Sequence, residues 1–72
     1  MMQQQIYSNM AGSVWKITVK VGDVIKVGQE VVILESMKME IPILSEYGGR
    51  VKTILIQEAD FVNDGDILLE LE

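Results

Sequence analysis

A lysine lies between two methionines near the middle of the chain, at Met37-Lys38-Met39, with Glu35-Ser36 before it and Glu40 after it. A lysine carries a primary amine on a flexible four-carbon stem, which can act as a nucleophile or as a point of covalent attachment. The adjacent methionines are adaptable apolar side chains that often contact partner proteins. This combination favours a lysine displayed for modification over a lysine that catalyses a reaction.

An enzyme that uses Ser36 and Lys38 as a Ser-Lys pair is an alternative, since residues two apart share a strand face. Such an enzyme needs an oxyanion hole and a substrate pocket, which a very small domain hardly offers. We therefore predict no catalytic residue. An unmodified structural or adaptor domain is a further alternative, and it predicts that Lys38→Arg has no consequence.

The composition limits what kind of domain this is. The 72 residues suffice for one small domain over residues 1–72, and the chain has neither Cys nor His, which excludes disulfides and zinc-thiolate sites; we expect no metal. The core must then depend on a well-closed sheet rich in β-branched residues.

The charge distribution argues against two classes of partner. The net charge is −5 and the six basic residues are scattered, so neither nucleic acid nor a membrane is an expected partner. The segment Met1–Gln5 contains no signal region. We expect a cytoplasmic protein that is monomeric.

The second half of the sequence repeats the first at an offset of 37 positions, the spacing between Gly12 and Gly49. Ten of the 35 aligned pairs are identical, among them Met2 with Met39, where ordinary residue usage gives roughly two. A fixed offset indicates repeated structural units. Two copies in so short a chain predict a pseudo-two-fold domain.

Each half is typical of β-strands separated by turns that contain glycine. Pro42 lacks an N–H group and is therefore expected at a sheet edge or a bulge. A helix over Leu34–Ile41 would suit the helix propensities of Leu, Met, Lys and Glu, but Pro42 and the preceding valines argue against it. We predict a hairpin whose turn is Met37-Lys38, with both residues at positive φ.

The repeat also predicts which residues are buried. Trp15 aligns with Lys52, and Ile33 with Glu70, so the two apolar residues are expected to point outward or only half inward. A scattered surface aromatic is the simplest interpretation of Trp15, with a partner contact as the alternative. A bulge is expected near residues 15–16 and 52–53. The predicted core pairs are apolar in both copies: Val14/Val51, Ile17/Ile54, Val19/Ile56, Val24/Phe61, Val32/Leu69 and Leu34/Leu71.

In the predicted hairpin, Ser36 lies opposite Met39 and Glu35 opposite Glu40. Like charges directly across a ladder are mildly destabilising, so folding alone does not explain the two glutamates. One interpretation is an acidic collar that a modifying enzyme recognises. The other is a solvated hairpin end whose charges keep the protein soluble.

Glu35-Ser36-Met37-Lys38-Met39 resembles the biotinylation motif of biotinyl domains, usually Glu-Ala-Met-Lys-Met, and so places the chain beside the biotinyl/lipoyl attachment family. The resemblance extends over nearly the whole chain, through Gly12-Ser13-Val14-Trp15-Lys16, Val21-Gly22-Asp23-Val24, Val27-Gly28-Gln29 and Asn63-Asp64-Gly65-Asp66-Ile67-Leu68. The chain is most similar to free-standing biotin/lipoyl attachment proteins. It departs from the family pattern at Ser36, where Ala is common, and at Ser8-Asn9-Met10-Ala11, and it lacks the thumb insertion of the bacterial acetyl-CoA carboxylase carrier.

The resemblance implies an all-β barrel-sandwich hybrid, in which two four-stranded antiparallel sheets place the modified lysine on a hairpin tip and both termini at the other end. It implies that a biotin protein ligase joins biotin to Lys38. The carrier would then serve as a non-catalytic subunit of a biotin-dependent carboxylase system, moving a carboxyl group from biotin carboxylase to carboxyltransferase.

The resemblance also implies a role in ligase recognition for the residues around the lysine, which are Glu35, Ser36, Met37, Met39 and Glu40. The nearest alternative is a lipoyl carrier with lipoate on the same lysine, or a domain that accepts both groups. Lipoyl domains usually present Asp-Lys-Ala at this turn, and the Met-Lys-Met of this chain favours biotin.

Overall fold

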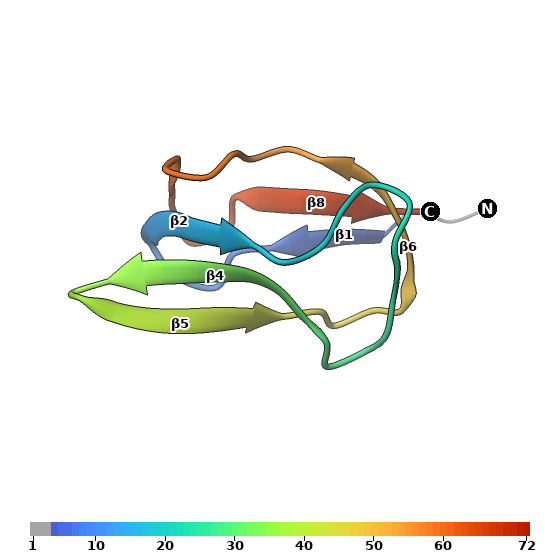
Figure 1. Cartoon of the computed structure of the whole chain (residues 1–72), viewed down its shortest axis with the longest axis horizontal. Helices are drawn as coiled ribbons and strands as arrows, with labels where there is room; N and C mark the ends of the chain where they lie inside the picture. Colours follow the sequence, from blue (N-terminus) through green and yellow to red (C-terminus); the bar gives the residue numbers. More distant parts are fainter. Residues whose placement is uncertain (1–3) are drawn as a thin grey trace.

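The computed structural model describes residues 4–72, and all of its regular structure is β (Figure 1). Residues 1–3, which include part of the N-terminal stretch and the Met2 position of the repeat, lie outside the described residues. Residues 4–72 contain no helix that could cross a membrane. The strands are β1 (Gln4–Tyr7), β2 (Gly12–Ile17), β3 (Val24–Ile25), β4 (Glu30–Ser36), β5 (Met39–Leu44), β6 (Gly49–Ile54), β7 (Phe61–Val62) and β8 (Ile67–Leu71).

The strands form two antiparallel four-stranded sheets, in the orders β1-β8-β6-β3 and β5-β4-β2-β7. A shift of 37 residues converts the first order into the second, strand for strand, so the predicted all-β fold with pseudo-two-fold symmetry is confirmed. The molecule is elongated, with extents of 38 × 18 × 17 Å. The β4–β5 hairpin lies at one end of the long axis and the C-terminus at the other (Figure 1).

The turns obey the same symmetry in their hydrogen bonds. The Lys20 N–H donates to the Asp23 carboxylate at 2.9 Å, and the Gln57 N–H donates to the equivalent Asp60 carboxylate at 2.9 Å. At the third position of these turns Gly22 has φ 96° and its counterpart Ala59 has φ 78°. Side-chain acceptors therefore fix these turns, which lead into the two-residue strands β3 and β7.

The hydrophobic core lies between the two sheets and draws on every strand. Of the predicted core pairs, Ile17 and Ile54 are half-buried and pack against this core. The fully buried side chains include Val14, Val31, Val32, Leu34, Val51, Leu68, Leu69 and Leu71.

One predicted core pair is wrong. Val24 and Phe61 are 68% and 64% exposed, while the next residues, Ile25 and Val62, are buried. Successive side chains of a strand point to opposite faces, so the predicted inward-facing position differs by one residue from the observed one in both copies. The same error occurs in both copies because β3 and β7 are equivalent strands of the repeat, and in each the second residue points inward.

The predicted irregularities of the strands are confirmed. The β2–β4 register shifts between Val14 and Lys16, and the β6–β8 register shifts between Val51 and Thr53. Pro42 lies on β5, an edge strand, as its missing N–H requires.

Gly12 allows β2 to approach the strand that leads to the lysine hairpin. A Cβ at Gly12 would lie 2.9 Å from the carbonyl oxygen of Glu35 on β4, and a Cβ at Gly49 would lie 3.0 Å from the carbonyl oxygen of Glu72. The missing side chain at these two equivalent positions brings the neighbouring strands together. Both sheets therefore depend on a glycine at the same place.

Because that contact is with backbone, we expect Gly12→Ala to lower the free energy of unfolding by about 1–3 kcal/mol. Thermal or urea unfolding followed by circular dichroism measures the effect. The control is Ser13→Ala, one residue along β2 at an exposed position, which should remain near wild type. Equal stability of both variants would contradict the close-approach argument.

Candidate functional site

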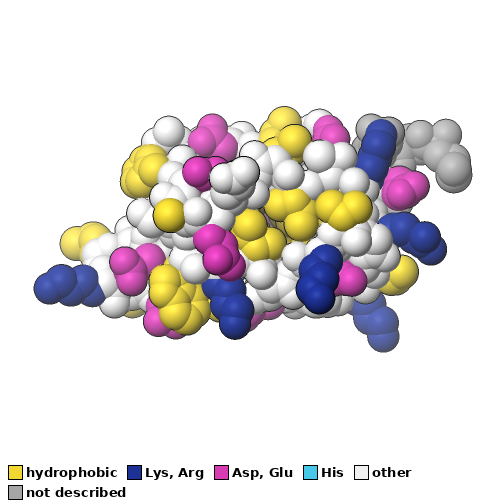
Figure 2. All heavy atoms as spheres, turned by 45° about the horizontal axis from the view of Figure 1, so that its top comes forward, with side chains coloured by type: hydrophobic (Ala, Val, Ile, Leu, Met, Phe, Trp, Pro, Cys, Tyr) yellow, Lys and Arg dark blue, Asp and Glu magenta, His cyan; other side chains and the backbone are white. Residues whose placement is uncertain are grey.

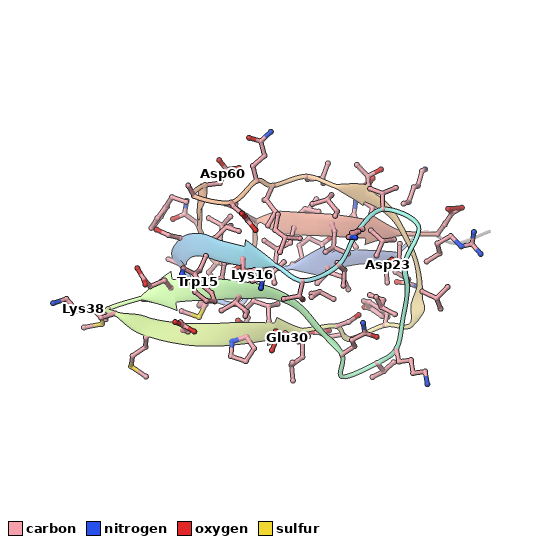
Figure 3. The ribbon with its side chains drawn as sticks, viewed as in Figure 1. Trp15, Lys16, Asp23, Glu30, Lys38 and Asp60 are labelled. Atoms are coloured by element: carbon pink, nitrogen blue, oxygen red, sulfur yellow. The ribbon has the colours of Figure 1, made fainter. Side chains whose placement is uncertain are left out.

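The lysine lies at the tip of a two-residue hairpin between β4 and β5. Ser36 pairs with Met39 and Glu35 with Glu40, which confirms the predicted register, and Met37-Lys38 forms the turn. Figure 3 shows Lys38 beyond the ends of the strands, pointing away from the rest of the molecule. The side chain is exposed, so its amine is accessible from solvent.

The backbone of the turn has an unusual conformation. The φ angles of Met37 and Lys38 are 52° and 63°, in the left-handed region. A two-residue hairpin with both residues in this region has the type I′ geometry, whose twist matches that of the flanking strands. Side chains other than those of Gly, Asn and Asp are disfavoured there, at a cost on the order of 1 kcal/mol per residue. The hairpin therefore holds Lys38 in a defined direction at some expense in stability.

The methionines beside the lysine belong to the surface. Met37 is 91% exposed and Met39 is 62% exposed, so both side chains lie outside the hydrophobic core. Two exposed thioether side chains thus flank the amine on either side. Their unbranched, polarisable side chains can adapt to a surface that closes over the tip.

Glu35 and Glu40 form a directly opposed pair of acidic residues just behind the tip. Both side chains are exposed, whereas Ser36 is half-buried. Among residues 4–72 no group of three or more Asp, Glu, His or Cys is arranged to hold a metal ion. The tip therefore presents one amine, two thioethers and two carboxylates to an approaching molecule.

Below the tip, the β4–β5 ladder is anchored in the core. Val32 and Leu34 on β4 are fully buried, and Ile43 on β5 is 3% exposed. The alternation of inward and outward residues fixes the register, since a slip by one position would expose these side chains. The lysine is therefore displayed from a rigid base.

The sequence predicts the residues that lie at the tip, but it does not predict one group of neighbouring surface residues. The sequence presents Trp15 as a single residue, either a scattered surface aromatic or a partner contact. In the structure it lies at the bulge that faces Ile33, which in turn pairs with Pro42. The available signal was the repeat, because all three positions are polar or charged in the other copy.

Comparisons with known proteins agree with this geometry. The profile of the biotin/lipoyl domain family described as "Biotin-requiring enzyme" matches residues 4–71. The biotin/lipoyl attachment protein of Bacillus subtilis (strain 168) is 63% identical over 62 residues, which cover 86% of this chain and 85% of that protein.

Larger proteins contain a similar segment. The mitochondrial propionyl-CoA carboxylase alpha chain of Sus scrofa is 39% identical over 67 residues, which cover 93% of this chain and 9% of that protein. The crystal structure of Kluyveromyces lactis urea carboxylase superimposes with a TM-score of 0.91 at 32% identity, covering 100% of this chain and 6% of the carboxylase chain. This chain thus corresponds to a small part of each of these two proteins.

The backbone strain at the turn can be tested with a substitution that relieves it. Asn tolerates the left-handed region, so we expect Met37→Asn to raise the free energy of unfolding by roughly 0.5 kcal/mol. This should appear as an increase of a few degrees in the melting temperature. Met39→Asn is the matched control, because Met39 lies in the strand and Asn is a poor strand former. A loss of stability in both variants would contradict the strain.

Proposed function

The chain belongs to the biotin/lipoyl attachment family, and we propose that Lys38 is the residue on which it carries biotin. The chain is a biotin carrier and not itself an enzyme, as its resemblance to a free-standing attachment protein and to segments of carboxylases indicates. The observation that supports Lys38 is its exposed position at the tip of a strained, well-anchored turn. The Met37-Lys38-Met39 motif singled out in the sequence lies at that tip.

We propose that a biotin protein ligase carries out the attachment. The Lys38 Nζ attacks the acyl carbon of biotinyl-adenylate; the amide C–N bond forms, the C–O bond to AMP breaks, and the amine loses a proton to a base. No side chain of the tip is a base suited to that step, since its ionisable neighbours are the exposed Glu35 and Glu40. The ligase supplies both the activated acyl group and the base.

The exposed tip also suits the steps that follow attachment, in which the carrier transfers a carboxyl group between active sites. Biotin, once attached, takes up a carboxyl group at one active site and releases it at another. We propose that these sites belong to a biotin carboxylase and a carboxyltransferase, because similar segments occur in propionyl-CoA and urea carboxylases. The elongated shape, with the hairpin at one end, lets the tip enter a deep active site while the body stays outside (Figure 1).

A lipoyl carrier is the second candidate, because the B. subtilis relative is named for attachment of either group. The same exposed lysine would serve as the attachment point. The two methionines at the turn favour biotin over lipoate, by resemblance to the motif of biotinyl domains. Discrimination between the two lies with the ligase that recognises the tip.

Intact-mass measurement tests the attachment site. The protein is expressed together with a biotin protein ligase, as wild type, Lys38→Arg and Lys26→Arg, the last being an exposed lysine in a different turn. We expect the mass increase of one biotinyl group in the wild type and in Lys26→Arg, and none in Lys38→Arg. A biotinyl increment on Lys38→Arg would refute the assignment. A lipoyl increment on wild type after expression with a lipoate ligase would support the second candidate.

The opposed glutamates are expected to lower the stability of the hairpin and to raise the efficiency of its biotinylation. Removing one charge relieves like-charge repulsion across the ladder, so Glu40→Gln should slightly raise the melting temperature, by less at high salt. The same change should lower kcat/KM for biotinylation, because the ligase loses an acidic contact. Glu46→Gln, exposed and beyond the end of β5, is the control for both measurements. An unchanged kcat/KM for Glu40→Gln would assign the acidic pair to solubility instead.

A further inference from the structure

The outer face of the lysine-bearing sheet carries adjacent apolar side chains. Trp15 is the extra residue of the β2 bulge, so it and Lys16 both oppose Ile33 on β4. Ile33 in turn pairs with Pro42 on the edge strand β5. Trp15 is 48% exposed, Pro42 is exposed and Ile33 is half-buried. These three residues are here called the Trp15–Ile33–Pro42 patch.

The pseudo-two-fold symmetry provides an internal control for this patch. The equivalent residues on the other sheet are Lys52, Glu70 and Gln5. There, the Gln5 amide donates a hydrogen bond to the Glu70 carboxylate at 3.1 Å across the β1–β8 ladder. The same backbone thus folds with polar side chains at all three positions. Folding alone does not require apolar residues there.

The patch lies on the approach to the lysine. Ile33 and Pro42 are each three positions from the Ser36–Met39 pair that closes the turn, a distance of about 10 Å along the strands. Figure 3 shows Trp15 in the half of the molecule that ends in Lys38. Hydrophobic and acidic side chains lie side by side toward that end in Figure 2.

Two exposed carboxylates separate the patch from the turn. The Glu35–Glu40 pair occupies the next outward-facing row of the ladder, between Ile33–Pro42 and the tip. A complementary partner surface is therefore apolar where it covers the patch and basic where it meets the glutamates. Apolar contact supplies affinity in such an interface, and the charge pairing fixes its orientation.

We propose that the Trp15–Ile33–Pro42 patch, continued by Glu35 and Glu40, is the docking surface for the biotin protein ligase; this rests on the proposed function. The ligase acts on the bare amine, which extends from the turn only by the four-carbon stem of lysine. Its active site must therefore come down onto the tip, and the rest of its surface then covers the sheet face immediately behind. Enzymes that act on attached biotin reach it through a longer arm and can remain farther from the sheet.

The test replaces two of the three patch residues with their equivalents on the opposite sheet. Trp15→Lys with Ile33→Glu is compared with wild type in steady-state biotinylation by a purified ligase with biotin and ATP, and product is measured by intact mass. We expect kcat/KM to fall at least tenfold through a rise in KM, with complete modification still reached at high carrier concentration. The single variant Trp15→Lys should give a smaller effect in the same direction. Melting temperatures establish that both variants are folded.

The reverse exchange on the other sheet, Lys52→Trp with Glu70→Ile, is the matched control and should leave kcat/KM unchanged. Folded patch variants with wild-type kcat/KM, or with a change in kcat alone, would overturn the docking surface. So would normal biotinylation combined with slower carboxylation of the biotinylated carrier, which would assign the patch to the carboxylase. If the wild type itself accepts no biotin, it is the proposed function that fails.

Discussion

The β4–β5 ladder, which ends in two consecutive residues at positive φ, is the constraint on which the rest of this structure depends. A two-residue connection leaves the chain almost no choice of conformation, because only the primed turns match the twist of the strands. Met37 and Lys38 adopt that conformation with side chains that disfavour it. The burial of Val32, Leu34 and Ile43 beneath the turn offsets this cost. Strain at the tip persists because the core below it is well packed.

The two-fold repeat explains how so short a chain builds such a base. Each half supplies two strands to each sheet, so neither half can bury its own apolar residues without the other. Equivalent glycines bring the strands together, and equivalent aspartates fix the turns. The lysine hairpin is the exception to this duplication, since it forms the junction between the two copies. Its equivalents, β8 and β1, are not joined by a hairpin within residues 4–72, and the lysine that we propose as the attachment point lies at this junction of β4 and β5.

Much of this architecture could be predicted from the sequence, for local physical reasons. The hairpin register follows from the hydrophobic alternation on both sides of Met37-Lys38, and the edge position of Pro42 follows from its missing N–H. The assignment of Val24 and Phe61 to the core failed because β3 and β7 are only two residues long. With so few residues there is no alternation to read, and the preceding turn decides which side chain points inward. The hairpin register already places Ile33 opposite Pro42, but the position of Trp15 beside Ile33 depends on the β2–β4 register, which β2 alone does not reveal.

The difference between the two outer faces is informative because the two sheets share one backbone plan. Residues needed for folding should be constrained alike in both copies, and the core pairs Val14/Val51 and Leu34/Leu71 behave in this way. The outer faces do not, since an exposed tryptophan on one sheet corresponds to a lysine on the other. Exposed apolar area on a small acidic protein brings a risk of association that polar residues would avoid. The fold does not need these apolar residues and solubility disfavours them, which is why we propose that they contact a partner. Their place beside the exposed amine is why we propose that this partner acts on the lysine.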